Sequence, residues 1–333
     1  MFSGCTTLSS VPHFNPTLSS AELTAGIRSM DSMFRGCTNL LDVGIINKPR
    51  SGSRTPFTTL YASNLRTGAY AHMFRGCSKL STVYFTQYEN TLTTTATSCF
   101  YSMFASCSKL TNTSNSICLD QTNCQAGWYK EMFQNCSSLK YAPIFLSTVT
   151  IDVCPRYCFQ GMFRNCINLT DFGGLEWIMA TDTVMDYGYA YMFYGCSKLT
   201  LNVEDTGSTD YYGYDIADDI IIDTNEYTPV SFANLPYIFN SYHVNDYGYQ
   251  YMFAYCSSLI VGPILNNGEV ESNKAYDHMF ANSEKVRYIV NKSIDANAYG
   301  YAWLENVQTN GKYFTVNSSN AKQLPSNWKI RVI

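Results

Sequence analysis

Cysteines are the residues of this 333-residue chain best suited to chemistry, and eight of the thirteen recur at one spacing. The eight are Cys5, Cys37, Cys77, Cys107, Cys136, Cys166, Cys196 and Cys256. Regularly spaced thiols could form disulfides, bind a metal or attack a substrate. Disulfide and zinc frameworks use cysteines in pairs, whereas these occur one at a time. We therefore interpret them as a structural column of free, buried thiols stacked from one repeat to the next.

The other five cysteines lie outside this column and form no second pattern. They are Cys99, Cys118, Cys124, Cys154 and Cys158. The pair Cys154 and Cys158 has no second pair beside it that would complete a zinc site, so we predict no metal and no cofactor. Disulfides between neighbours in the column stay open as an alternative, because strands stacked about 4.8 Å apart lie within bridging range.

Histidines and catalytic motifs give little support for an enzyme. The chain has four histidines, and His72 and His278 both stand directly before a methionine of the repeat described below. A shared repeat position favours a structural role over general-base catalysis. The sequence contains no nucleophile elbow, no zinc-binding helix motif and no phosphate-binding loop. We predict that the chain is not an enzyme.

The regular cysteines belong to a longer repeated phrase: Met-Phe, two residues, Cys, two residues, Leu. Its methionines stand at positions 1, 33, 73, 103, 132, 162, 192, 252 and 279, and Ser283 replaces cysteine in the last copy. Most steps are close to thirty residues, and one double step of 60 separates Met192 from Met252. A repeat of this length is typical of a solenoid. Weaker copies at 231–238 and 302–307 bring the predicted array to about eleven coils.

Each repeat predicts one helical turn followed by one strand. A large apolar residue precedes each methionine by three positions, as Tyr129 precedes Met132, and Phe133 completes an i, i+3, i+4 face. Glycine or asparagine three residues after the methionine would end this helix. The segments after leucine, such as 80–85 and 286–290, have the β-branched or alternating pattern of strands. The units predict an α/β solenoid with a parallel β-sheet on one face and short helices or turns on the other.

The phrase resembles the leucine-rich repeats of the BspA-like bacterial surface proteins, with methionine where alanine usually stands. Its Met-Phe form is similar to repeat proteins of gut bacteria and their phages. The resemblance covers the chain from Met1 to the closing segment 324–330. It implies a leucine-rich-repeat solenoid over residues 1–307 with a long insertion at 203–230, followed by a C-terminal cap at 308–333. It also implies display outside a cell, on a cell surface or on a virion.

Composition narrows the partners that such an array could bind. The net charge is −4, only 14% of residues are charged, and 27 are tyrosines. Residues 1–150 carry 11 basic and 6 acidic groups, whereas 151–333 carry 11 and 20. Neither half contains a basic stripe that would neutralise phosphates, so nucleic acid is not an expected partner. No run of eighteen apolar residues is present, so we expect no membrane insertion.

Two groups of tyrosines are the candidate ligand-binding residues. Tyr211, Tyr212 and Tyr214 lie in the acidic long insertion, whose carboxylate spacing matches no calcium loop. The second group, Tyr84, Tyr141 and Tyr288, falls at comparable positions after the repeat leucines. Exposed tyrosine covers much contact area with little entropy to lose on binding. The alternatives are ordinary packing of the insertion and scattered surface aromatics without a role.

Three Tyr-Gly-Tyr segments precede methionine turns, at 187–189, 247–249 and 299–301. We expect the second tyrosine of each segment in the core and the first one partly exposed.

The sequence therefore favours a non-enzymatic recognition module that acts in adhesion or receptor binding. Its expected partner is a cell-surface protein or glycan of a host. The alternative is a structural subunit of a virion or filament, in which the solenoid packs against other copies of itself or against virion proteins.

Overall fold

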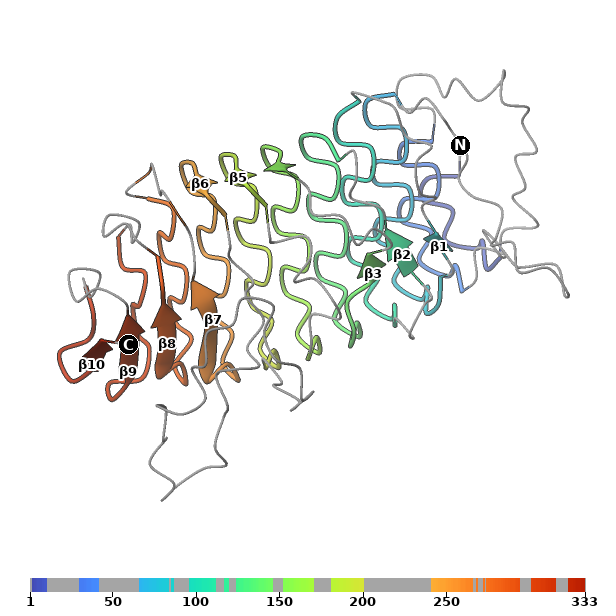
Figure 1. Cartoon of the computed structure of the whole chain (residues 1–333). Coiled ribbons are helices and arrows are strands. Elements are labelled where there is room, and N and C mark those ends of the chain that lie inside the picture. Colours follow the sequence, from blue (N-terminus) through green and yellow to red (C-terminus); the bar gives the residue numbers. More distant parts are fainter. Residues whose placement is uncertain are drawn as a thin grey trace, which may run out of the picture.

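A computed structural model shows an elongated stack of coils, with the N-terminus and the C-terminus at opposite ends (Figure 1). The structure describes residues 2–10, 30–41, 66–83, 85–86, 96–111, 117–119, 124–145, 152–170, 181–200, 241–265, 268, 272, 274–293, 301–315 and 323–332. Within these segments, no helix has the length and apolar character needed to cross a membrane.

Turns stand where the sequence pattern predicts a helix in each repeat. The described part of the chain contains strands and turns but no helix. Around Met132, one turn is closed by the bond from the Met132 N–H to the Tyr129 carbonyl (3.1 Å), and the next by Cys136 N–H to Phe133 (3.0 Å). The third residue of each turn has a positive φ, 54° at Glu131 and 61° at Asn135, as in a type II turn. The sequence predicted either short helices or turns on this face, and the described residues form turns.

The reason for the wrong helical prediction is a backbone period of four residues. Positive φ angles recur at every fourth position, for example 68° at Gly127, 54° at Glu131 and 61° at Asn135. Two residues of each four face the core and the next two face solvent, so Tyr129, Met132, Phe133 and Cys136 are all buried. Spacings of three and four satisfy this pattern as well as they satisfy a helix. Glycine and asparagine are frequent because they tolerate the left-handed conformation.

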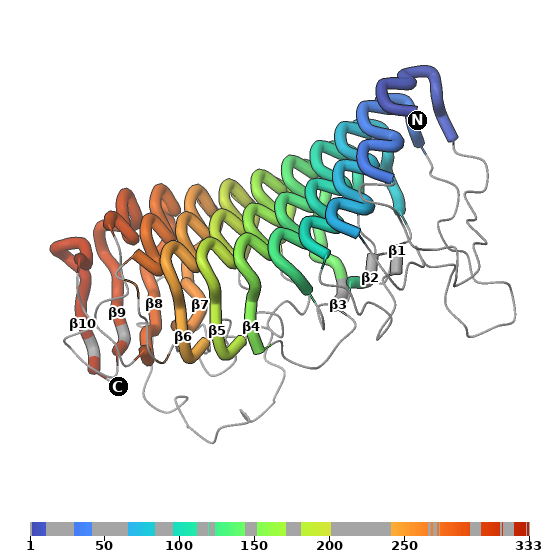
Figure 2. Tube along the Cα trace, turned by 90° about the horizontal axis from the view of Figure 1, so that it is seen from above, coloured from blue at the N-terminus to red at the C-terminus, as the bar shows by residue number. Residues whose placement is uncertain are grey.

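Hydrogen bonds between neighbouring coils use the amides that the turns leave over. Glu131 N–H donates to the Gln160 carbonyl (2.8 Å) and Phe133 N–H to Met162 (2.9 Å), while the intervening amides close the turns. In an α-helix, these amides would donate to carbonyls of the same coil. In the stacked turns, backbone N–H groups of one coil therefore donate to carbonyls of the next coil. This bonding explains the continuous row of turns along the array (Figure 2).

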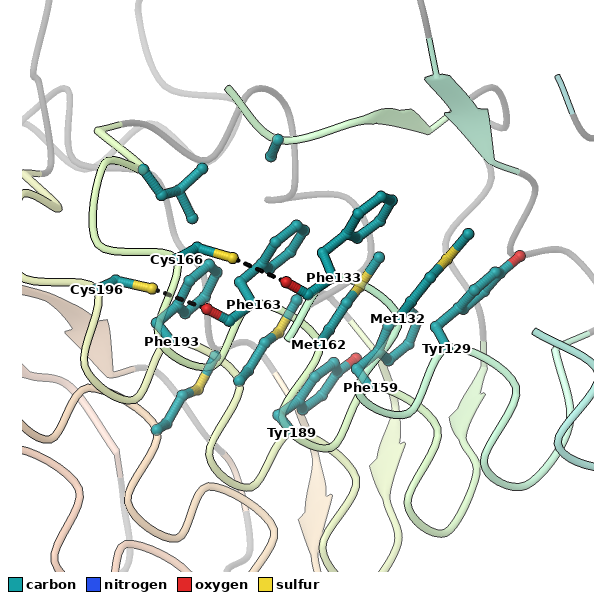
Figure 3. Close-up of a cluster of buried hydrophobic side chains, with 14 of the residues drawn as sticks. Tyr129, Met132, Phe133, Phe159, Met162, Phe163, Cys166, Tyr189, Phe193 and Cys196 are labelled. Carbon is teal, nitrogen blue, oxygen red and sulfur yellow. Dashed lines mark hydrogen bonds between the residues drawn. The ribbon is translucent and has the colours of Figure 1, made fainter. Parts of the chain in front are cut away.

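Two columns of stacked rings fill the core beneath the turns. One column contains the repeat phenylalanines, with ring centroids 5.7 Å apart between Phe133 and Phe163 and 5.6 Å between Phe163 and Phe193. The second column places Phe159 5.5 Å from Tyr129 and 5.4 Å from Tyr189 (Figure 3). Stacking of this kind adds to the burial of each ring.

Short parallel strands line two opposite edges of the coils (Figure 1). The edge that follows the repeat leucines contains β1 (Phe85–Thr86), β2 (Ile117–Leu119), β3 (Ile144–Phe145), β7 (Val261–Leu265), β8 (Tyr288–Asn291), β9 (Lys312–Thr315) and β10 (Lys329–Val332). The other edge contains β4 (Val153–Cys154), β5 (Thr183–Val184) and β6 (His243–Val244). The strand order is β1-β2-β3 and β10-β9-β8-β7 on the first edge and β4-β5-β6 on the second. The predicted parallel pairing of strands is therefore confirmed, but the described strands form three short sheets, and the second edge with β4, β5 and β6 was not part of the predicted single sheet.

The double step of the repeat contains no additional coil on the turn side. Phe193 N–H donates to the Met252 carbonyl (3.0 Å), and the rings of Phe193 and Phe253 stack 5.5 Å apart. On the strand side, β5 pairs directly with β6. The two described coils are therefore direct neighbours, although the weak copy at 231–238, which lies outside the described residues, was predicted to supply a coil between them. The prediction that it fills a coil position there is wrong.

Replacing residues 201–240 should therefore leave the stack intact. The segment 171–180 joins equivalent points, because Thr200 N–H donates to the Thr170 carbonyl (3.2 Å) and the hydroxyls of Thr181 and Ser241 lie 3.2 Å apart. We expect a variant with a second copy of 171–180 in place of 201–240 to keep one folded array, measured by circular dichroism and thermal unfolding. Loss of the folded signal would show that 201–240 supplies part of the stack.

At the C-terminal end, the last weak copy is a true coil. Trp303 takes the place of phenylalanine in the column and is fully buried, and Phe280 N–H donates to its carbonyl (2.9 Å). The segment 308–333, predicted as a cap, contributes β9 and β10, which extend the sheet beyond β8. Trp328 is buried there, and its indole Nε1–H donates to the Gln308 carbonyl (2.8 Å).

Candidate functional site

The regular cysteines lie in the core and act as hydrogen-bond donors. Every thiol of the column except that of Cys5 in the first coil donates to the phenylalanine carbonyl of the preceding coil, for example Cys166 to Phe133 and Cys196 to Phe163, both at 3.1 Å (Figure 3). All eight are free thiols, and all but Cys5, which is partly exposed, are buried. Burial raises the pKa of Cys77 and Cys136 to about 12. Such thiols stay protonated at neutral pH and are poor nucleophiles.

Ser283 shows why serine can replace cysteine in this column. Its hydroxyl donates to the Phe253 carbonyl at 2.6 Å, as Cys256 donates to Phe193 at 3.2 Å. We expect Cys166→Ala to lower the free energy of unfolding by about 1–2 kcal/mol, because the donor and some buried volume are lost. Cys166→Ser should cost less, because it keeps a donor. Urea denaturation of both variants tests this, and equal losses would contradict the donor role.

Three further cysteines gather in the core but form no metal site. Cys124, Cys154 and Cys158 are buried, and burial raises the pKa of Cys154 and Cys158 well above the usual value, with the neighbouring thiols adding to the effect. Across the described segments, no group of three His, Cys, Asp or Glu side chains has the geometry to hold a metal ion.

Of the six predicted ligand-binding tyrosines, two lie among the described residues. Tyr84 and the insertion residues Tyr211, Tyr212 and Tyr214 lie outside the described residues. Tyr141 is 43% exposed, and the Lys140 ammonium lies 4.9 Å from its ring centroid. Tyr288 is partly buried in β8, with the Arg287 guanidinium 5.3 Å from its ring centroid. Tyr141 and Tyr288 share the edge that follows the leucines, which we call the leucine edge. In each case the cation belongs to the residue directly before the tyrosine.

A larger group of tyrosines lies on the solvent side of the turns, which we call the turn face. Two columns of partly exposed rings stack there. Tyr187 lies 5.4 Å from Tyr157 and 5.1 Å from Tyr247, and Tyr251 lies 5.0 Å from Tyr191 and 4.5 Å from the His278 ring. The interplanar angles lie between 11° and 18°. We call these six residues the tyrosine ladder.

Two more tyrosines widen the ladder. Tyr194 lies 5.8 Å from Tyr191 and 5.0 Å from Tyr255, and Tyr255 is 46% exposed. Burial raises the pKa of Tyr191, Tyr194 and Tyr251, and neighbouring tyrosines add to the effect. The ladder hydroxyls of these residues therefore remain neutral groups that can both donate and accept.

Basic side chains cover the outer ring faces of the ladder. The ammonium groups of Lys130 and Lys274 lie 5.1 Å and 5.4 Å from the ring centroids of Tyr157 and Tyr247, at the two ends of one column. The Arg164 guanidinium lies 5.3 Å from the Tyr191 centroid, at the start of the other column. Because neighbours and cations occupy the ring faces, the ladder presents mainly ring edges and hydroxyls to solvent.

The sequence contains a signal for the ladder, although the ladder is not among the predicted binding residues. Tyr157, Tyr187 and Tyr247 stand five residues before their methionines, and Tyr191 and Tyr251 stand one residue before. The Tyr-Gly-Tyr segments anticipated part of it. Their second tyrosines at 189 and 249 are buried as expected, but Tyr301 is 76% exposed, so that expectation is wrong for the last segment.

Comparisons with known proteins add little to this geometry. The sequence matches no family model and no curated protein. One solved structure is similar, a leucine-rich repeat protein from Bacteroides ovatus, at 14% identity over 100% of this chain and 85% of that chain. The TM-score is 0.26, a value too low to carry an argument. The assignment of this chain as a solenoid of parallel coils therefore depends on its own hydrogen-bond ladders and stacked columns.

Proposed function

We propose that the chain is a non-enzymatic leucine-rich-repeat recognition module, displayed on a cell surface or virion, that binds a protein or glycan of a host cell. The observation that carries the proposal is the pairing of aromatic ring and cation on the leucine edge, at Tyr141 with Lys140 and at Tyr288 with Arg287. Tyrosine and arginine are among the residues enriched at binding hot spots. A stack bonded coil to coil holds such side chains in place before binding, which lowers the entropy cost.

The experiment measures binding of the purified chain to a glycan panel and to intact host cells, with Tyr141→Ser and Tyr288→Ser as test variants. We expect each variant to weaken binding at least tenfold, which corresponds to about 1.4 kcal/mol. The matched control is Tyr242→Ser, which removes an exposed tyrosine beside β6, on the opposite edge of the coils and away from the turn face. A folded chain that binds neither glycans nor cells would contradict the proposed function. Equal weakening by all three variants would contradict the placement on the leucine edge.

The second candidate is a structural subunit of a virion or filament. The turn face favours it, because a regular row of aromatic side chains along a solenoid suits contacts between subunits. Electron microscopy of the purified chain at high concentration tests this function. Extended fibres would support the structural subunit, and their absence from concentrated folded protein would count against it.

A further inference from the structure

The turn face carries a charge gradient along the stack, with the tyrosine ladder at its centre. In the coils before the ladder and in its first coil, the exposed or partly exposed side chains are mainly basic: Arg35, Arg75, Lys130, Arg156 and Arg164, of which Arg156 forms an ion pair with Asp186 of the next coil. Within and beyond it they are mainly acidic, namely Asp186, Asp246, Asp277 and Glu305, of which Asp277 is nearly buried. Asp31, Glu131 and Lys274 are the exceptions. The face is therefore positive at one end, aromatic in the middle and negative at the other.

Such a face is complementary to itself when one copy is turned end over end. A two-fold axis through the ladder would place the basic flank of each copy against the acidic flank of the other, and ladder against ladder. In an isologous contact of this kind, the same patch serves both subunits and the assembly closes at two. We propose that the turn face is the interface of an antiparallel homodimer, with a second copy of this chain as its occupant.

The ladder has the properties of an interface core. Its rings are ordered by stacking on one another, so little side-chain entropy is lost on association. Neutral tyrosine hydroxyls can donate to and accept from the same hydroxyls in a partner copy. The alternative occupant, a glycan, depends on open ring faces for stacking, and these faces are largely covered by Lys130, Lys274, Arg164 and neighbouring rings.

The dimer goes beyond the proposed function and does not share its site. The leucine edge with Tyr141 and Tyr288 is built by other residues of the coil than the turn face, so both copies could bind a ligand. Two linked binding sites raise the apparent affinity for a surface that carries many ligands.

The test uses the whole chain in two charge-reversed forms. The acidic form carries Lys130→Glu and Arg164→Glu, which leaves the Arg156–Asp186 ion pair within each copy intact, and the basic form carries Asp246→Lys and Glu305→Lys. Sedimentation equilibrium should show a dimer for the unchanged chain, which weakens as salt is raised. Each reversed form alone should dimerise at least tenfold more weakly, because like charges then face each other. An equimolar mixture of the two forms should recover dimers that contain one copy of each.

Two further variants distinguish the contribution of the ladder to dimerisation from that of the charges and from an effect on folding. Tyr251→Ser should weaken dimerisation at least tenfold while circular dichroism shows an unchanged fold, and Tyr141→Ser on the leucine edge should leave dimerisation unchanged. A folded, unchanged chain that stays monomeric at its highest soluble concentration would overturn the proposal. So would a mixture of reversed forms that fails to associate, or glycan binding that Tyr251→Ser abolishes.

Discussion

Replacing Phe193 with alanine should lower the free energy of unfolding by about 4 kcal/mol, the middle of the range for removing a buried phenylalanine. The ring is fully buried, with Phe163 5.6 Å and Phe253 5.5 Å from its centroid. It joins the coil before the double step to the coil after it. Its loss removes buried area and two stacking contacts at the point where neighbouring coils are 60 residues apart in the chain, twice the usual step.

Denaturation in urea, followed by circular dichroism, measures this effect. In a repeat array, weakening one interface can separate the unfolding of its two sides, so we expect a broader or biphasic transition. The control is Ile167→Ala, which removes an apolar side chain that is 46% exposed. It should change stability by less than about 0.5 kcal/mol. A similar small change for Phe193→Ala would show that the two coils are not packed as described.

Gly311→Ala should have the second largest effect. We expect it to lower the free energy of unfolding of the C-terminal strand β10 by about 3 kcal/mol, with the rest of the stack unchanged. A Cβ atom at this position would overlap ring atoms of Trp328. The ring could yield only by leaving its buried site and breaking the Nε1–H bond to the Gln308 carbonyl (2.8 Å). That movement would also pull on the Lys329 N–H bond to the Gly311 carbonyl (2.9 Å), the first link of β10 to the sheet.

Hydrogen exchange of residues 329–332 reports the loosening of β10, and a red shift of tryptophan emission reports exposure of Trp328. Lys312→Ala, at the next residue, is the matched control and should change neither signal. Unchanged protection of β10 in Gly311→Ala would contradict the predicted contact between Gly311 and Trp328.

The sequence by itself determined the repeat, its length, the buried column of cysteines and the edge of strands after the leucines. These features follow from spacing, because identical side chains at one repeat position must share one environment in a stack. The sequence also predicted that Ser283 and the weak copy at 302–307 occupy repeat positions, because each keeps the spacing of its neighbours.

Other features were decided only by the tertiary structure. The turns replaced the expected helix because half of their amides bond to the next coil, and no sequence window shows that coil. The direct contact of Phe193 with Phe253 was hidden because the spacing around 231–238 imitates a repeat. The tyrosine ladder emerged because stacking brings together residues thirty or sixty positions apart, such as Tyr157, Tyr187 and Tyr247. Spacing shows which residues are equivalent, whereas only the bonds between coils show which equivalent residues become neighbours.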